Sequence, residues 1–298
     1  MSSSSFLLEN LFDLKDRIAL VTGGGTGIGW MIAQGLAANG AKVYITGRRK
    51  EVLEKTAASF DGKGSVIPMV MDATNRESIA SAQKTIQTQE GRLHILVNNA
   101  GQGGPVSPFF NDTSAPEHQS PGALGGALFT NESFEEWADV YTINSSSIFF
   151  VTTAFLGLLA KGSEDRAGYT SCVVNNSSIS GHMKLAQNHF GYNSSKAAAA
   201  HLTKMLSTEF ALKKIPVRVC GVAPGVYESE MTAKRLAQGG DAVNAVGLGV
   251  LPVPAGRAGT PEEIAGTVIY LVSPAGCYTN GQEIMVDGGY LAVNPSTV

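Results

Sequence analysis

Short apolar runs rich in β-branched residues alternate along the chain with longer segments in which apolar positions recur every three or four residues. Runs of the first kind, when glycine and polar residues bound them, are typical of buried parallel strands, and segments of the second kind are typical of amphipathic helices. Strands are expected at residues 17–23, 41–47, 65–73, 94–101, 170–178, 217–225 and 283–289. Helices are expected at residues 28–40, 51–60, 77–91, 134–159 and 192–213.

This alternation predicts an α/β protein in which right-handed helical crossovers join parallel strands. The expected fold class is a single-domain Rossmann fold, with a doubly wound seven-stranded parallel sheet and helices on both faces. Residues 1–298 are expected to form this one domain, with residues 1–13 as an N-terminal extension.

One segment, residues 102–131, breaks the alternation because it is rich in glycine, proline and serine and shows no period. A loop of this length inside a compact domain is either a functional lid or a disordered insertion. Composition alone does not separate the two interpretations, so both stay open.

Composition narrows the class of protein further. Charged residues make up only 16% of the chain and 35 residues are glycine, which suits a sheet buried on both faces. A net charge of -3 gives no reason to expect nucleic acid or a membrane surface as a partner. The apolar run at residues 148–160 is too short to cross a bilayer.

The cysteines and the start of the chain indicate the compartment. Cys172, Cys220 and Cys277 are odd in number and lack the spacing of metal ligands, so reduced thiols and no metal site are expected. The first residues lack the pattern of a secretory signal. A cytoplasmic protein is therefore expected.

A glycine-rich turn, TGGGTGIG at residues 22–29, follows the first expected strand and opens the first expected helix. It fits neither the strict G-x-G-x-x-G pattern nor a Walker loop, because Trp30 stands where the Walker lysine would be. It does fit T-G-x-x-x-G-x-G. Glycines at such a position let the backbone approach a phosphate at a helix N-terminus, so a nucleotide site is expected here.

The end of the second strand indicates which nucleotide would bind. An NAD site places a carboxylate about here for the ribose 2′-hydroxyl, whereas this chain has Gly47 followed by Arg48 and Arg49. Two guanidinium groups could grip a 2′-phosphate, which favours NADP(H) over NAD. The alternative is a solvated basic turn leading into a helix.

The pair Tyr192 and Lys196 stands four residues apart at the start of an alanine-rich helix, so both side chains can reach one target. An isolated pair of this kind is more often part of a solvated helix face. The order of motifs along the whole chain favours the catalytic interpretation.

From about Leu14 to Tyr290 the chain resembles the short-chain dehydrogenase/reductase family. The resemblance rests on motifs in family order: TGGGTGIG at 22–29, MDA at 71–73, NNAG at 98–101, Asn144, Ser178, the Y-x-x-x-K of Tyr192 and Lys196, PG at 224–225 and TNGQEIMVDGG at 279–289. Within the family it is most similar to 3-oxoacyl-thioester reductases, including the rhamnolipid-pathway type. It departs from them in a longer path from NNAG to Asn144.

The resemblance implies a role for each catalytic candidate. Tyr192 would protonate the substrate carbonyl, and Lys196 with the oxidised nicotinamide would lower the phenol pKa. Ser178, favoured over its neighbour Ser177, would hydrogen-bond the substrate oxygen. Asn144 would hold a water that links Lys196 to solvent.

The resemblance also implies a set of cofactor contacts and a region, residues 226–256, that would cover the substrate. The contacts with NADP(H) are expected at Gly23, Thr26, Gly27, Ile28, Gly29, Arg48, Arg49, Asp72, Ala73, Asn99, Ala100, Gly101, Tyr192, Lys196, Pro224, Gly225, Val226 and Thr232.

The function expected is NADP(H)-dependent hydride transfer between nicotinamide and a carbonyl or secondary alcohol, with a 3-oxoacyl or related apolar ketone as substrate. The alternatives are a non-redox cyclase, isomerase or dehydratase that keeps the nucleotide site, and a non-catalytic binding module. No Lys or Arg occurs between Arg92 and Lys161, which favours a neutral substrate. Partners would be the small-molecule carbonyl or alcohol and further copies in a homodimer or homotetramer, through the helix flanked by alanines 197–200.

Overall fold

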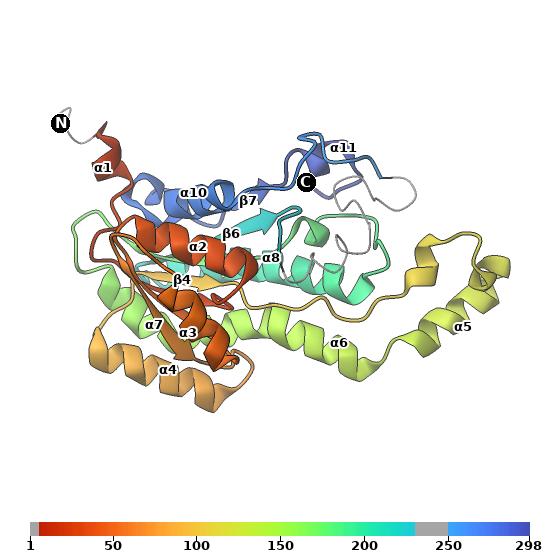
Figure 1. The fold of residues 1–298 in the computed structure, drawn as a ribbon, viewed down its shortest axis with the longest axis horizontal. Helices are drawn as coiled ribbons and strands as arrows, with labels where there is room; N and C mark the ends of the chain where they lie inside the picture. Colours follow the sequence, from red (N-terminus) through yellow and green to blue (C-terminus); the bar gives the residue numbers. More distant parts are fainter. Residues whose placement is uncertain (1–5, 230–249) are drawn as a thin grey trace.

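The computed structural model describes residues 6–229 and 250–298. Seven parallel strands form one sheet in the order β3-β2-β1-β4-β5-β6-β7 (Figure 1). Their bounds are β1 Ile18–Thr22, β2 Lys42–Gly47, β3 Ser65–Val70, β4 Ile95–Asn98, β5 Ser171–Asn176, β6 Val217–Pro224 and β7 Glu283–Val286. The hydrophobic runs thus predicted every strand of this sheet, and the expected fold class is confirmed.

Helices cover both faces of the sheet. One face is covered by α2 (Gly27–Ala38), α3 (Lys50–Ala58) and α10 (Pro261–Val272), and the other by α4 (Arg76–Gln89), α7 (Ser147–Gly162) and α8 (Phe190–Leu212). Single-turn helices α1 (Leu8–Leu11) and α11 (Tyr290–Val293) lie near the chain ends.

The two cores follow from the alternation of side chains along each strand. On β1, Ala19 and Val21 pack in the cluster beneath α2, whereas Ile18 and Leu20 pack in the cluster beneath α7. Every residue of β1, β4, β5 and β6 is buried, which explains why these strands appear in the sequence as runs without charge except at Arg218 of β6, whose guanidinium donates to backbone carbonyls.

Helix α10 is one element that the hydrophobic pattern did not predict. Its start carries a readable signal, a capping box between Thr260 and Glu263 with a proline at the first turn. The helix packs closely on α2, since a Cβ atom added to Gly35 would lie 2.5 Å from Ala265 Cβ. It provides the crossover that β7 needs to join the sheet in parallel.

Residues 102–131 contain more regular structure than their composition suggested. They form two short 3-10 turns, η2 (Pro108–Asn111) and η3 (Pro116–Gln119), and the helix α5 (Pro121–Asn131). The Ser120 hydroxyl caps α5 by accepting the N–H of Ala123 at 3.1 Å. No residue of α5 is buried, and Figure 1 shows the helix projecting away from the sheet. We call residues 104–131 the arm.

Helix α6 (Phe134–Tyr141), a π-helical turn η4 (Thr142–Ser146) and α7 follow one another as a continuous helix, as the pattern at residues 134–159 predicted. This helix is 29 residues long, and one 18-residue stretch of it has a mean hydropathy of 1.6, so by length and composition it could cross a membrane. However, the helix packs against β4, β5 and α4. A helix buried in a protein core can have the same length and hydropathy as one that crosses a membrane.

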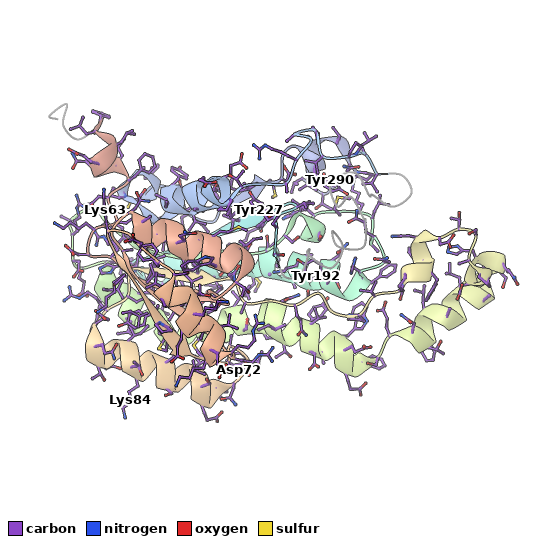
Figure 2. All side chains as sticks on the ribbon, viewed as in Figure 1. Lys63, Asp72, Lys84, Tyr192, Tyr227 and Tyr290 are labelled. Atoms are coloured by element: carbon purple, nitrogen blue, oxygen red, sulfur yellow. The ribbon has the colours of Figure 1, made fainter. Side chains whose placement is uncertain are left out.

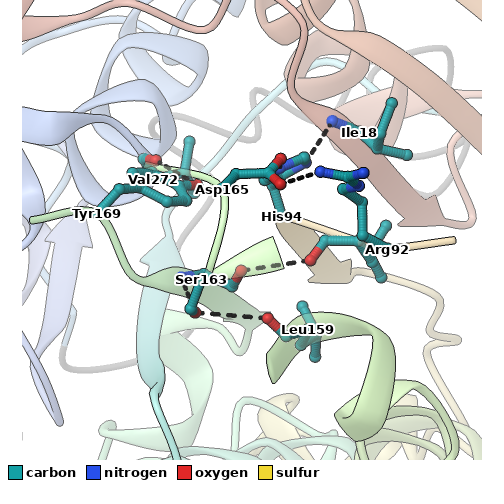
Figure 3. A network of polar contacts seen from close by, with 10 residues as sticks. Ile18, Arg92, His94, Leu159, Ser163, Asp165, Tyr169 and Val272 are labelled. Atoms are coloured by element: carbon teal, nitrogen blue, oxygen red, sulfur yellow. Dashed lines mark hydrogen bonds and ion pairs between the residues drawn. The ribbon is translucent and has the colours of Figure 1, made fainter. Parts of the chain in front are cut away.

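A buried polar network closes the end of the sheet where the parallel strands begin (Figure 3). The His94 ring accepts the N–H of Ile18 at Nδ1, at 2.9 Å, and its Nε2 lies 2.6 Å from Asp165 Oδ2. Because Nδ1 accepts, the ring proton must be on Nε2, so His94 is held as the neutral tautomer. Arg92 pairs with the other oxygen of Asp165.

Candidate active site

The glycine turn packs tightly on the end of β4. Gly23 has a φ of 62°, and a Cβ atom there would lie 3.0 Å from Ala100 Cα. A Cβ atom on Gly29 would lie 2.3 Å from both Asn99 Nδ2 and the Gly23 carbonyl oxygen. Neither position can carry a side chain without moving the turn, and the exposed backbone N–H groups of the α2 N-terminus therefore stay accessible to an anion.

Asn99 and Thr22 join the ends of β1 and β4. Asn99 Nδ2 donates to the carbonyls of Thr22 at 2.9 Å and Gly23 at 3.2 Å, while Thr22 Oγ1 accepts the N–H groups of Asn99 at 2.9 Å and Ala100 at 3.0 Å. Asn176 adds β5 to this network by donating to Asn99 Oδ1 at 2.7 Å. Sequence reasoning missed Thr22, which stands in the quoted TGGGTGIG motif, and Asn176, which stands in the expected strand at 170–178.

A cleft of about 940 Å³ opens where six of the strands end. Asp72, Tyr192 and Tyr227, labelled in Figure 2, all line it. Of the residues expected at the site, the cleft brings together Gly23, Thr26, Gly27, Ile28, Gly29, Arg48, Arg49, Asp72, Ala73, Asn99, Ala100, Gly101, Ser178, Tyr192, Lys196, Pro224 and Gly225.

Two of the expected residues that the structure describes, Val226 and Asn144, do not line this cleft. Val226 lines a separate cavity of about 510 Å³ near β7, and its contact with the cofactor stays a prediction. Asn144 is buried behind the cleft. Thr232 lies outside the described residues. Tyr227 and Ser229, which sequence reasoning did not single out, line the cleft in the region of Val226.

Arg48 and Arg49 form a basic edge of the cleft. Both side chains are exposed, and Gly47 before them provides no carboxylate. Asp72 also lines the cleft, near Arg48. The pKa of its carboxyl is lowered, mainly because the Thr74 hydroxyl donates a hydrogen bond to it at 2.7 Å and also because of the nearby charge of Arg48.

At the other end of the cleft, Lys196 and Tyr192 come together with Ser178. Lys196 Nζ donates to the Asn176 carbonyl at 3.0 Å and lies 5.8 Å from the centre of the Tyr192 ring. Burial lowers the pKa of Lys196 to about 8, and the charge of Glu283 opposes that shift.

Two opposing effects act on the pKa of the Tyr192 phenol. Burial raises this pKa, and a hydrogen bond with Ser178 opposes the increase. The expected lowering of the phenol pKa by Lys196 together with the oxidised nicotinamide stays a prediction.

Asn144 lies in the π-helical turn η4, a local geometry often found at functional sites. Its carboxamide bonds to protein groups at both atoms: Oδ1 accepts the Gln102 N–H at 2.9 Å, and Nδ2 donates to the Gln102 carbonyl at 2.9 Å and to Ser195 Oγ at 3.0 Å. A Cβ atom on Gly101 would lie 2.9 Å from Asn144 Oδ1 and 3.5 Å from Lys196 Nζ. Asn144 therefore anchors the segment after NNAG beside Lys196, and the water contact expected of it stays a prediction.

The two neighbouring serines face different partners. Ser177 Oγ has one proton and donates it to Glu283, the nearer acceptor, while the Val222 carbonyl lies 3.1 Å away. Ser178 Oγ accepts the N–H of Ser180 at 3.1 Å and bonds to Tyr192. Only Ser178 is placed beside the phenol.

Comparison with known proteins decides the family. A family model described as enoyl-(acyl carrier protein) reductase matches residues 23–291. Short-chain dehydrogenase/reductase VdtF of Byssochlamys spectabilis is 36% identical over 100% of both chains. The rhamnolipids biosynthesis 3-oxoacyl-[acyl-carrier-protein] reductase of Pseudomonas aeruginosa is 33% identical over 94% of this chain and 98% of its own. The chain belongs to the short-chain dehydrogenase/reductase family.

A solved structure of this family agrees with the assignment. The Pseudomonas aeruginosa RhlG/NADP active-site complex superimposes with a TM-score of 0.79 at 31% identity, covering 94% of this chain and 98% of its own. The resemblance to 3-oxoacyl-thioester reductases of the rhamnolipid type is thus confirmed. As a short-chain dehydrogenase/reductase, the protein is an oxidoreductase that uses a nicotinamide cofactor and acts on a small molecule.

Proposed function

We propose that this short-chain dehydrogenase/reductase is an NADP(H)-dependent carbonyl reductase in which Ser178, Tyr192 and Lys196 are catalytic. The observation that carries the proposal is their convergence in the same cleft as the glycine turn. A dinucleotide stretched along that cleft would place its phosphates at the turn and its nicotinamide near Tyr192.

The preference for NADP(H) is supported by the basic edge of the cleft. Exposed Arg48 and Arg49 could form charge-assisted hydrogen bonds with a 2′-phosphate, and Gly47 leaves space for it. The similar RhlG structure is a complex with NADP, which also favours this nucleotide. The contacts expected at the glycine turn, at Asp72 and Ala73, at residues 99–101 and at residues 224–225 belong to this proposal.

A bound reduced nicotinamide supplies the hydride, and the residues of the chain handle the oxygen. The Tyr192 hydroxyl donates its proton to the carbonyl oxygen as negative charge develops there. Ser178 Oγ, hydrogen-bonded to that phenol, steadies the same oxygen. Lys196 places a cation near the Tyr192 ring and so stabilises the phenolate that the proton transfer leaves.

The substrate proposed is a neutral, apolar or aromatic ketone, such as a 3-oxoacyl derivative without an anionic carrier. Between Arg92 and Lys161 the chain has no cation and six acids: Asp112, Glu117, Glu132, Glu135, Glu136 and Asp139. Asp139 lines the cleft itself. Such a surface repels an anionic substrate or carrier protein.

A non-redox activity is less well supported, because the similar proteins are named as reductases and dehydrogenases. A non-catalytic binding module would not need Ser178, Tyr192 and Lys196 to lie together in one cleft.

We also propose a homodimer or homotetramer in the cytoplasm. Phe149 and Phe150 on α7 and Met205 on α8 are exposed, and a second copy would cover them. The free cysteines Cys172, Cys220 and Cys277 support a reducing compartment.

The test is oxidation of NADPH and of NADH with a panel of neutral ketones and 3-oxoacyl thioesters. Turnover should be faster with NADPH, and Tyr192→Phe should lower kcat at least about 100-fold because it removes the acidic proton. NADPH should still bind to this variant. A Tyr192→Phe variant with wild-type turnover would contradict the proposed mechanism.

A further inference from the structure

A buried carboxylate that the proposed reaction does not use lies next to the serine turn. Glu283 is the first residue of β7, and only 4% of its side chain is exposed. Its two oxygens bind different residues: Oε1 accepts from Ser177 Oγ, and Oε2 lies 2.8 Å from His182 Nε2. A carboxylate is costly to bury unless hydrogen bonds compensate it, so this arrangement points to a specific role.

The Glu283 side chain reaches its partners by crossing the neighbouring strand. In the register of the sheet, Glu283 stands beside Gly221 of β6. A Cβ atom on Gly221 would lie 3.1 Å from Glu283 Cγ and 3.3 Å from Oε1. Because Gly221 has no side chain, the Glu283 carboxylate can pass over β6 and reach the end of β5.

Ser177 and His182 are the two ends of the turn that carries Ser178. Between them runs η5 (Ile179–Gly181), which begins directly after Ser178. On its far side the turn packs against the backbone of α8, since a Cβ atom on Gly181 would lie 2.7 Å from the carbonyl carbon of Lys196. The turn is thus held between α8 and one carboxylate that bonds to both of its ends.

We propose that Glu283 is a positioning residue: by binding Ser177 and His182 at once, it fixes the turn on which Ser178 stands and sets the place of Ser178 Oγ beside Tyr192. The inference rests on the proposed function, because Glu283 acts through Ser178.

The charge of Glu283 has a second effect, on Lys196. Burial lowers the Lys196 pKa to about 8, and Glu283 opposes this, so the carboxylate favours the ammonium form. Among the described residues, Tyr192 on the same helix lies beside Lys196, His182 bonds to Glu283, and Asp139 of α6 lines the same cleft. In the free enzyme, loss of the Glu283 charge should move the alkaline decline of kcat/KM to lower pH.

Two substitutions distinguish the effect of the Glu283 hydrogen bonds from the effect of its negative charge. Glu283→Ala removes both hydrogen bonds, so kcat should fall about 10- to 100-fold while the KM for NADPH stays within about twofold. Glu283→Gln can still accept from Ser177 and donate to the other tautomer of His182. The kcat of this variant should stay within about fivefold of wild type, and the alkaline decline of its kcat/KM should shift to lower pH.

Further variants keep the test decisive if Glu283→Ala does not fold. Ser177→Ala removes one end of the contact and should lower kcat about tenfold without raising the KM for NADPH. Glu164→Ala removes an exposed carboxylate elsewhere on the molecule and should leave kcat and the pH profile unchanged.

The outcomes distinguish this inference from the proposed function. If Tyr192→Phe is inactive while the folded Glu283 variants and Ser177→Ala keep wild-type kcat and pH profile, the positioning role is wrong and the reductase remains. If the wild-type protein reduces no ketone of the panel with either nucleotide, the proposed function fails and this inference fails with it.

Discussion

Gly47, at the end of β2, provides no carboxylate at the position where an NAD site would place one. A carboxylate at this point accepts a hydrogen bond from a ribose 2′-hydroxyl and repels a 2′-phosphate. With glycine here and exposed guanidinium groups at Arg48 and Arg49, the local charge has the opposite sign. Discrimination between the two nucleotides should therefore be concentrated in a few side chains.

Arg48→Ala should raise the Kd for NADPH about tenfold or more, because one charge-assisted hydrogen bond to phosphate is lost. The Kd for NADH should change less than about twofold. Quenching of protein fluorescence on titration with each nucleotide measures both constants. Arg166→Ala, which removes an exposed arginine paired with Asp13, is the matched control. An unchanged Kd for NADPH in Arg48→Ala would show that this arginine does not bind the 2′-phosphate.

The residues of the cleft could be predicted where the backbone itself makes the site. Gly23, Asn99 and Gly225 stand in turns whose motifs are local in sequence, so a pattern identifies them. The contacts of Glu283 and Asn144 could not be predicted in this way. His182 and Glu283 are separated by 101 positions, and their meeting depends on the side chain crossing β6.

Among the elements, the arm makes a contact that bears on the substrate. Phe110 of η2 packs edge-on against Phe190, the first residue of α8, with ring centres 5.0 Å apart. Phe190 precedes Tyr192 by two positions on the same helix. The arm therefore touches the catalytic helix at its start.

Phe110→Ala should raise the KM for an apolar ketone about tenfold while the KM for NADPH stays unchanged, because the ring supports the start of α8 on the substrate side. Steady-state kinetics with each substrate varied in turn measures the two constants. Phe129→Ala is the matched control, since that ring lies on α5 and is 84% exposed. Equal KM values for the ketone in both variants and the wild type would contradict a substrate role for the arm.

The elements themselves could be predicted to different degrees. Buried strands were found because a strand covered on both faces is apolar throughout. Helix α5 has no buried residue, so no periodic pattern marked it, and its start depends on the cap at Ser120. The π-helical turn within 142–146 depends on tertiary bonds of Asn144, which periodicity does not encode.

At the scale of the whole molecule, acid stability should depend on the network of Figure 3. Burial, the largest cause, lowers the pKa of His94 below its usual value, although Asp165 opposes the shift. The unfolded chain therefore binds a proton at higher pH than the folded protein does. The stability that neutral His94 contributes is complete above the unfolded pKa of about 6.5 and is lost as the pH falls below it.

Urea denaturation at about pH 7.5 and about pH 5.5 should show this loss as a lower free energy of unfolding at the more acidic pH. His94→Asn can keep an acceptor for the Ile18 N–H without titrating, so its difference between the two pH values should be smaller. His201→Asn removes an exposed histidine and should behave as the wild type does. An identical pH dependence in all three proteins would exclude His94 as the cause.

The π-helical turn at Thr142–Ser146 also sets how α6 is rotated relative to α7. A π turn holds one residue more than an α turn, and each residue of an α-helix adds about 100° of rotation. Deletion of one residue here would wind the helix back into phase and swing α6 around its axis relative to α7. Because the arm precedes α6 in the chain but also contacts α8 through Phe110, the rotated α6 and that contact would not both be kept.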